Sequence, residues 1–154
     1  MNVEIERKFL VEGERWRKLG KGTQYRQGYL SIDLERTVRV RTDGVTGFIT
    51  IKGISENARR DEFEYKIPVD DANRMLDILC ISPLIEKTRY KITDKDMVWE
   101  VDEFWGVNEG LIIAEVELKE FNQNITLPDW IGKEVTDDPA YFNANLVKHP
   151  YSKW

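Results

Sequence analysis

Residues 36–53, RTVRVRTDGVTGFITIKG, form the stretch of sequence that decides the fold class. Both of its halves, 36–42 and 47–53, alternate apolar with polar side chains over much of their length, which is the period of a half-buried β-strand. Asp43-Gly44 lies between the halves, and this dipeptide favours a tight turn. The stretch therefore predicts two antiparallel strands joined by a short connection.

The same alternation recurs along most of the chain. It is found in residues 3–10, 60–67, 85–92, 97–104 and 111–121, and more weakly in 24–32, where Gly28 interrupts the pattern. Asn108-Glu109-Gly110 adds a turn signal before the last of these runs. The sequence therefore predicts eight strands in an antiparallel arrangement.

Three short helices are expected among the strands. Helical patterns occupy residues 12–19, 70–80 and about 138–148. Asp70 or Asp71 is the expected N-cap of the second helix, and Asp138 followed by Pro139 opens the third. The predicted fold class is α+β, mainly antiparallel β. The residues expected on the buried face of the second helix are Met75, Leu76 and Leu79.

The composition is that of a folded, acidic protein with an unusual number of charges. Of 154 residues, 23 are Lys or Arg and 28 are Asp or Glu, so 33% of the chain is charged, against about 25% in ordinary globular proteins. Length and apolar content suggest one domain over residues 1–154. The net charge of −5 argues against nucleic-acid or membrane partners, since anionic partners require a basic surface. The N-terminus lacks a signal-peptide pattern, so we expect a cytoplasmic protein.

Side chains alternate between the two faces of a strand, so each predicted strand can be divided by residue parity. One face is apolar in the ordinary way. The other face carries seven basic and eight acidic residues, often of one sign along a strand. The basic residues are Lys8, Arg39, Arg41, Lys52, Lys87, Arg89 and Lys91. The acidic residues are Glu4, Glu6, Glu62, Glu64, Glu100, Asp102, Glu115 and Glu117.

Two interpretations of this charged face are open. It can be the solvated side of an antiparallel sandwich, where polar alternation is normal. However, like charges at positions i and i+2 project the same way about 7 Å apart and repel each other. A site for a polyanion and its metal ions accounts for the sorting, because carboxylates suit Mg²⁺ or Mn²⁺ and Arg and Lys suit phosphate oxygens. A closed barrel of about eight strands can hold such a ligand.

The N-terminal motif Glu4-x-Glu6-x-Lys8 resembles the E-x-E-x-K signature of the CYTH superfamily, also called triphosphate tunnel metalloenzymes. The later strands are similar to the family's order of charged strands. They contribute Arg39-x-Arg41, Thr50-x-Lys52, Glu62-x-Glu64, Lys87-x-Arg89, Asp102 and Glu115-x-Glu117. The resemblance covers nearly the whole chain. It implies an eight-stranded β-barrel with a few flanking helices, whose charged tunnel binds triphosphate.

The resemblance also implies roles for the charged residues. The implied metal ligands are Glu4, Glu6, Glu115 and Glu117. Glu62, Glu64 and Asp102 are expected to ligate or orient a second metal ion or its water, and with Glu4 and Glu6 they form the expected catalytic set. The implied substrate-binding residues are Lys8, Arg39, Arg41, Lys52, Lys87 and Arg89.

The implied function is hydrolysis of inorganic triphosphate to pyrophosphate and phosphate, with one or two Mg²⁺ or Mn²⁺ ions as cofactors. Phosphoryl transfer depends on charge neutralisation and positioning, and a bound metal ion can activate water. Alternatives are hydrolysis of a nucleoside or thiamine triphosphate, and adenylyl cyclase activity of the class IV type. A non-catalytic polyphosphate-binding module is a further alternative. The acidic strands favour catalysis, because binding alone requires only the basic ones.

Two expectations concern the outside of the predicted barrel. If the charged faces point inward, the apolar faces point outward, and three helices are too few to cover eight strands. Exposed apolar surface usually marks an interaction site, so we predict a homodimer. Trp16 and Leu19 are expected to cap a barrel end. Tyr141, Phe142 and Leu146 are expected to pack the last helix onto the barrel.

Overall fold

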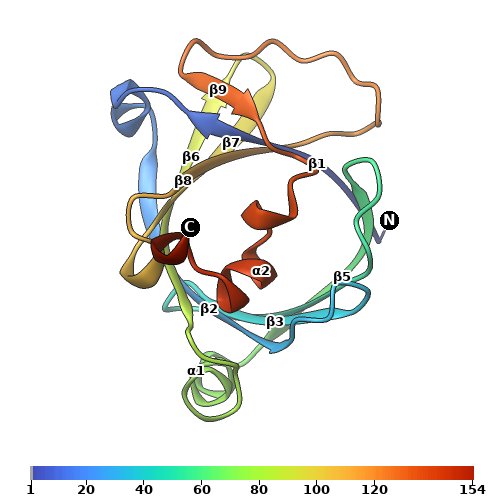
Figure 1. Cartoon of the computed structure of the whole chain (residues 1–154), viewed down its shortest axis with the longest axis vertical. Coiled ribbons are helices and arrows are strands. Elements are labelled where there is room, and N and C mark those ends of the chain that lie inside the picture. The colour runs from blue at the N-terminus through green and yellow to red at the C-terminus, as the bar shows by residue number, and fades with distance from the viewer. Residues whose placement is uncertain (1) are drawn as a thin grey trace.

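The computed structural model describes residues 2–154 and contains nine β-strands and two α-helices (Figure 1). The strands are β1 (Val3–Val11), β2 (Lys21–Ser31), β3 (Thr37–Thr42), β4 (Gly47–Lys52), β5 (Arg59–Ile67), β6 (Ile85–Asp94), β7 (Met97–Phe104), β8 (Ile112–Glu117) and β9 (Ile131–Glu134). The helices are α1 (Val69–Ile78) and α2 (Asn143–Lys148). The predicted α+β class, mainly antiparallel β, is confirmed.

Eight of the strands close into an antiparallel barrel, as the sequence predicted. Neighbouring strands follow the order β5-β4-β3-β2-β6-β7-β8-β1, and β1 pairs with β5 to complete the circle. This closing contact is short, because only Val3–Ile5 pair with Arg59–Asp61. Beyond it, β1 pairs with β9, a four-residue strand that the sequence analysis did not predict.

Apolar side chains on the outside of the barrel are covered in two places. Trp16, Trp99 and Trp130 belong to one buried cluster, which lies under the 3₁₀ turn Arg15–Lys18 and the segment before β9. On another side, Ala72 and Leu76 of α1 pack over β3 and β4. Two separate apolar clusters therefore pack on the outside of the barrel. The barrel interior does not belong to either cluster.

The C-terminal segment closes one end of the barrel. Figure 1 shows α2 inside the ring of strands. Leu146 and Val147 of α2 belong to a buried cluster with Ile85 of β6, Phe104 of β7 and Ile113 of β8. These three strand residues have the same parity as the charged face, so the lumen is apolar at this end. We call them, together with α2, the lumen floor.

Glycine explains why the weakest predicted strand is continuous. β2 runs without interruption through Gly28 and is one of the longest strands. A Cβ atom at this position would lie 2.7 Å from Leu84 Cδ2 and 2.8 Å from Cys80 Cβ. Only glycine lets the segment after α1 approach the strand so closely. Gly28 therefore marks a packing contact and does not end the strand.

The first two predicted helices differ from those observed. In place of a helix over 12–19 there is only the 3₁₀ turn, and it buries Trp16 while Leu19 is exposed. Helix α1 has Pro68 at its N-cap position, so the predicted cap at Asp70 or Asp71 was wrong. Leu79 lies beyond the end of α1 and is 60% exposed, because Ala72 and Leu76 make the buried contacts.

The predicted C-terminal helix is divided into two pieces. Asp138 Oδ1 accepts a hydrogen bond from Ala140 N at 3.0 Å, which confirms the predicted cap. The 3₁₀ turn Pro139–Tyr141 then ends at Phe142, whose backbone is extended, and α2 follows. This break turns the chain into the barrel. Among residues 2–154, the structure contains no helix long and apolar enough to cross a membrane.

Candidate functional site

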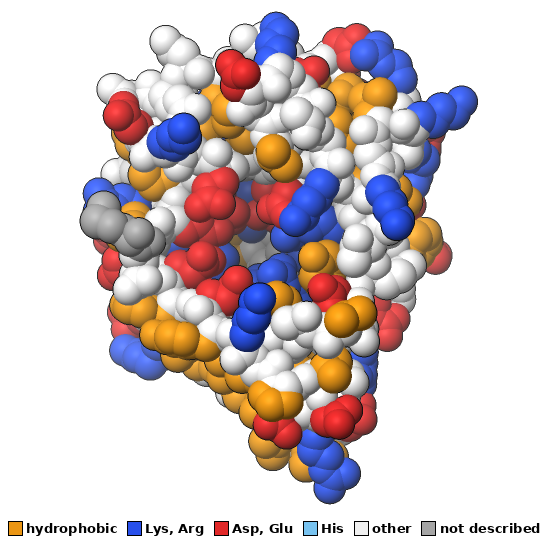
Figure 2. Space-filling model, turned by 180° about the vertical axis from the view of Figure 1, so that it is seen from behind, with side chains coloured by type: hydrophobic (Ala, Val, Ile, Leu, Met, Phe, Trp, Pro, Cys, Tyr) orange, Lys and Arg blue, Asp and Glu red, His pale blue; other side chains and the backbone are white. Residues whose placement is uncertain are grey.

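The barrel lumen contains a cavity of about 200 Å³. Figure 2, which views the face opposite to that of Figure 1, shows acidic and basic side chains gathered around a hollow. All eight barrel strands contribute side chains to the cavity, and so do Phe142, Asn143 and Ala144 of the C-terminal segment. The charged faces therefore point inward, and the interpretation as the outer face of a sandwich is wrong.

The structure brings almost the whole predicted site together around this cavity. Asp102 is the exception, since it does not line the cavity and lies fully buried behind it. Glu100, which shares the parity of Asp102, does line the cavity, whereas Lys91 lies exposed near the end of β6. The predicted site residues that line the cavity are Glu4, Glu6, Lys8, Arg39, Arg41, Lys52, Glu62, Glu64, Lys87, Arg89, Glu115 and Glu117.

Carboxylates crowd together on one wall of the lumen, where β1 pairs with β8. Glu6 lies opposite Glu117 in this pairing, and Lys8 lies opposite Glu115. Burial, together with the negative charges of Glu115 and Glu4, raises the pKa of Glu6 well above its usual range. Each added negative charge is thus costly on this wall, which we call the acidic wall. It consists of Glu4, Glu6, Glu115 and Glu117.

Lysines compensate part of this negative charge. Burial alone would raise the pKa of Glu4, but Lys52 Nζ lies 2.8 Å from Glu4 Oε2 and holds that pKa well below its usual range. Lys8 Nζ lies 3.8 Å from Glu6 Oε1. The Nζ of Lys8 also lies 5.6 Å from the ring centre of Phe142, so the C-terminal segment contacts this wall.

The acidic wall fits a divalent cation in its chemistry. Its donors are hard carboxylate oxygens, and the partner of the buried Glu4 Oε2 is a lysine ammonium that a metal ion can replace. Among residues 2–154, no three His, Cys, Asp or Glu side chains are arranged around one point to hold a metal ion. The lysines lie against the carboxylates instead, as described above. A bound cation would therefore take over from Lys52 and Lys8 as the partner of these oxygens.

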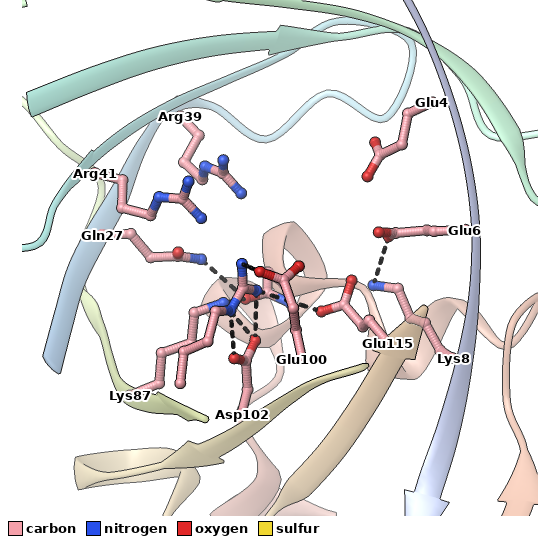
Figure 3. A network of polar contacts seen from close by, with 12 residues as sticks. Glu4, Glu6, Lys8, Gln27, Arg39, Arg41, Lys87, Glu100, Asp102 and Glu115 are labelled. Atoms are coloured by element: carbon pink, nitrogen blue, oxygen red, sulfur yellow. Dashed lines mark hydrogen bonds and ion pairs between the residues drawn. The ribbon is translucent and has the colours of Figure 1, made fainter. Parts of the chain in front are cut away.

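Arginines occupy the opposite wall of the lumen, which we call the basic wall. Figure 3 shows Arg39 and Arg41 across the lumen from Glu4 and Glu6. Arg39 Nη2 donates to Thr50 Oγ1 at 3.2 Å, and the Arg41 Nη2 atom lies 3.9 Å from Glu64 Oε2. The Nε atoms of both arginines are buried without a hydrogen-bond partner among residues 2–154. Such donors are suited to bind the oxygens of an anion.

Burial and like charges make this wall strongly electropositive. Burial, followed by the positive charges of Arg39 and Arg89, lowers the pKa of Arg41 to about 10. Three guanidinium groups thus lie close together, with little carboxylate compensation at Arg41. A polyanion would relieve this repulsion, and we expect it to bind beside these groups.

Asp102 binds two cationic side chains, those of Lys87 and Arg89, at the boundary between the basic wall and the lumen floor. Lys87 Nζ donates to Asp102 Oδ2 at 2.8 Å, and Arg89 donates to both carboxylate oxygens, from Nε at 2.7 Å and from Nη2 at 2.9 Å. Burial lowers the pKa of Lys87 to about 8, and the nearby charge of Arg89 also lowers it, although Asp102 raises it. Asp102 is therefore saturated by protein donors.

Several residues of the site were not predicted from the sequence. Arg60 lines the cavity, and its Nε lies 3.6 Å from Glu4 Oε2. It has the parity of Glu62, so this signal was available in the sequence. Asn143 Oδ1 accepts hydrogen bonds from Gln27 Nε2 at 2.9 Å and Lys87 Nζ at 3.4 Å. Nothing local in the sequence indicates that the C-terminal segment enters the barrel.

Known proteins resemble this chain over its whole length. A family model of the CYTH domain matches residues 2–151. An inorganic triphosphatase of Acetivibrio thermocellus is 52% identical over 154 residues, which cover 100% of this chain and 99% of that protein. An inorganic triphosphatase of Nitrosomonas europaea is 35% identical, over 94% of this chain and 97% of that protein. A solved structure of an inorganic triphosphatase is 33% identical with a TM-score of 0.64, covering 94% of this chain and 97% of that one.

The match to the family model includes the residues of the site. The match to the family model runs from the E-x-E-x-K motif in β1 to beyond α2, and so includes every residue of the two walls. The family resemblance expected from the charged strands is confirmed, and the chain belongs to the CYTH domain family.

Proposed function

We propose that the chain is a cytoplasmic, metal-dependent inorganic triphosphatase that hydrolyses triphosphate to pyrophosphate and phosphate in the barrel lumen. The observation that carries the proposal is the opposition of an acidic and a basic wall across one cavity of about 200 Å³. The basic wall can hold the phosphate chain, and the acidic wall can hold its cation. The inorganic triphosphatases that are 52% and 35% identical support the same assignment.

Each set of side chains has a distinct task in this proposal. Arg39, Arg41 and Arg89 bind phosphate oxygens through guanidinium donors, and Lys87 adds an ammonium group beside the lumen floor. Lys8 and Lys52 lie against the carboxylates of the acidic wall, and they would be free to bind the phosphate chain when these carboxylates hold a cation. Asp102 acts as a positioning residue, because its oxygens are occupied by Lys87 and Arg89.

The acidic wall would hold one or two Mg²⁺ or Mn²⁺ ions, which supply charge neutralisation and an activated water. Glu62 and Glu64 lie at the edge of the cavity on β5 and orient a water or accept its proton. The apolar lumen floor excludes solvent from the inner end, which strengthens the electrostatic interactions of the lumen. In-line attack on the terminal phosphorus then depends on the basic wall, which fixes the phosphate chain.

Phosphate release from inorganic triphosphate, with and without Mg²⁺ or Mn²⁺, tests this proposal. We expect metal-dependent release that is abolished in the double variant Glu4→Ala, Glu6→Ala. The matched control is Glu109→Ala, Glu120→Ala, since both residues are exposed outside the lumen, and it should retain full activity. Release by the wild-type chain that does not exceed that of the Glu4→Ala, Glu6→Ala variant would contradict the proposal.

Substrate preference is tested by comparing triphosphate, ATP and thiamine triphosphate at equal concentration, with cyclic AMP measured separately. The lining of the cavity is mostly polar and charged, which favours a substrate that consists of phosphate alone. We therefore expect the highest kcat/KM for inorganic triphosphate and no cyclic AMP. Triphosphate binding without turnover would favour the alternative of a non-catalytic binding module.

The predicted homodimer remains part of the proposal, and the outer face of β4 and β5 is the surface we assign to it. Ile51 pairs with Phe63 across these strands, and both side chains are exposed on the outside of the barrel. Arg59 and Asp61 precede Phe63 on the same face of β5, with one charge of each sign. A two-fold axis across β5 would place each Arg59 opposite Asp61 of the partner subunit, so a second copy is a complementary partner.

Light scattering at micromolar concentration tests the dimer. The wild-type chain should have twice the 18.1 kDa mass of one chain, and Phe63→Glu should be monomeric because a charge would be buried in the interface. Val45→Glu is the control, since Val45 is exposed in the turn between β3 and β4. A monomeric wild-type chain would contradict the dimer and leave the triphosphatase proposal untouched.

A further inference from the structure

Two aromatic rings flank the most crowded arginine of the lumen. The guanidinium carbon of Arg41 lies 4.8 Å from the ring centre of Tyr25 on β2 and 5.7 Å from that of Phe48 on β4. The ring of Tyr25 also lies 5.7 Å from the guanidinium carbon of Arg89. Arg41 is on β3, and β2 and β4 are the two neighbours of β3 in the barrel. Each neighbouring strand thus presents an aromatic ring to Arg41.

Both rings occupy the inner face of their strands. Phe48 alternates with Thr50 and Lys52, which line the cavity, and it pairs directly with Arg41 across β3 and β4. Tyr25 lies two residues before Gln27, which pairs with Arg41 across β2 and β3. Neither ring is among the residues that line the cavity. Their part in the site is therefore contact with arginine.

Arg41 needs such contacts because its other neighbours hold it weakly. It is buried near Arg39 and Arg89, so like charges repel it. Within the described part of the chain its Nε has no hydrogen-bond partner, and its contact with a carboxylate, Glu64, is 3.9 Å long. In contrast, Asp102 accepts two short hydrogen bonds from Arg89. The negative faces of aromatic rings attract a guanidinium group without neutralising its charge.

We propose that Tyr25 and Phe48 are positioning residues that hold Arg41 toward the lumen and thereby set the affinity for triphosphate. This inference rests on the proposed function only in the identity of the anion. A carboxylate in place of the rings would hold Arg41 equally well, but it would compete with the substrate for the guanidinium donors. Aromatic rings keep these donors free, because a stacked guanidinium group retains its in-plane N–H groups.

The test is calorimetric binding of triphosphate in a chelator-containing buffer, where metal-dependent hydrolysis does not proceed, together with kinetics in the presence of metal. Tyr25→Met and Phe48→Met keep much of the side-chain volume and remove the aromatic face. We expect each to weaken triphosphate binding about tenfold and to raise KM by a similar factor, with kcat within about twofold. Tyr25→Phe and Phe48→Tyr keep the ring and should bind as the wild type does.

Two further variants separate positioning from a general effect on folding. Arg41→Lys should weaken binding in the wild-type background and have little additional effect in the double variant Tyr25→Met, Phe48→Met, since the rings act through Arg41. Phe121→Met, at an exposed ring outside the lumen, is the control. Should the Met variants melt early, Tyr25→Leu and Phe48→Leu provide a second pair, and the Arg41→Lys comparison is still made within each background.

The inference is overturned if the Met variants bind triphosphate as tightly as the wild type. It is also overturned if Tyr25→Phe and Phe48→Tyr lose as much affinity as the Met variants, or if Arg41→Lys has its full effect without the rings. Binding that follows the expected pattern in a chain that releases no phosphate would support the positioning role and contradict the triphosphatase proposal. The two failures are therefore distinguishable.

Discussion

The two ends of the lumen use the same strands and the same side-chain parity, yet one end is apolar and the other is charged. On β6, Ile85 belongs to the lumen floor, and Lys87 and Arg89 follow at steps of two. On β8, Ile113 belongs to the floor and Glu115 follows. One strand face thus changes from core to binding site within two residues.

The difference teaches how the charges are divided between structure and ligand. Next to the floor, Lys87 and Asp102 are fully buried and paired with each other. Toward the open end, Glu62 and Glu117 are more exposed, and Arg41 has only a long contact with a carboxylate. Charges beside the floor are therefore held in place by protein partners while they face the lumen, and charges farther out have fewer such partners.

Removal of the buried Asp102 carboxylate, at the boundary between the lumen floor and the charged lumen, should have the largest effect on stability. Asp102→Ala leaves Lys87 and Arg89 buried without their shared partner. We expect the free energy of unfolding to fall by about 4 kcal/mol, measured by urea denaturation. Glu100→Gln, on the same strand but partly exposed, should change it by less than about 1 kcal/mol. Equal losses in the two variants would contradict the division.

Truncation of the floor should have the next largest effect. Leu146 of α2 is fully buried against the apolar end of the lumen. Leu146→Ala should reduce the free energy of unfolding by about 3 kcal/mol, because a cavity replaces the side chain. Leu127→Ala, at a site 45% exposed, should change it by less than about 0.5 kcal/mol. A stable Leu146→Ala variant would mean that α2 does not support the barrel.

A smaller loss is expected where the floor meets the basic wall. Asn143 Oδ1 accepts hydrogen bonds from Gln27 and Lys87. Asn143→Ala leaves the amide of Gln27, which is fully buried, without this partner. We expect the free energy of unfolding to fall by about 2 kcal/mol and KM for triphosphate to rise. Asn122→Ala, at an exposed site, should change neither quantity, and an unchanged KM in Asn143→Ala would separate α2 from the site.

The same boundary shows how far the sequence predicts the molecule. Strand parity predicted the charged lumen, because alternation is a local property of the chain. Parity also puts Ile85, Phe104 and Ile113 on the charged, inward face, but it does not say that they form an apolar floor, since what covers them, α2, arrives from the far end of the sequence. The turn of the backbone at Phe142 has no strong local signal either. Parity would have identified Arg60, but it says nothing of Phe142 and Asn143.

A change of pH tests the role of the Lys87 charge beside the floor in the wild-type chain. The pKa of Lys87 is lowered to about 8 from 10.5, chiefly by burial, so its ammonium is lost above pH 8, and KM for triphosphate should rise by up to about tenfold per pH unit. Stability should change in the opposite sense, because between pH 8 and 10.5 the unfolded chain binds this proton and the folded chain does not, which favours folding as pH rises. Weaker binding together with higher stability distinguishes the titration of Lys87 from alkaline unfolding, in which both binding and stability are lost. In Lys87→Arg the guanidinium stays charged, so KM should be flat between pH 8 and about 9, below the pKa of about 10 of Arg41, and an equal rise in that variant would assign the titration to another group.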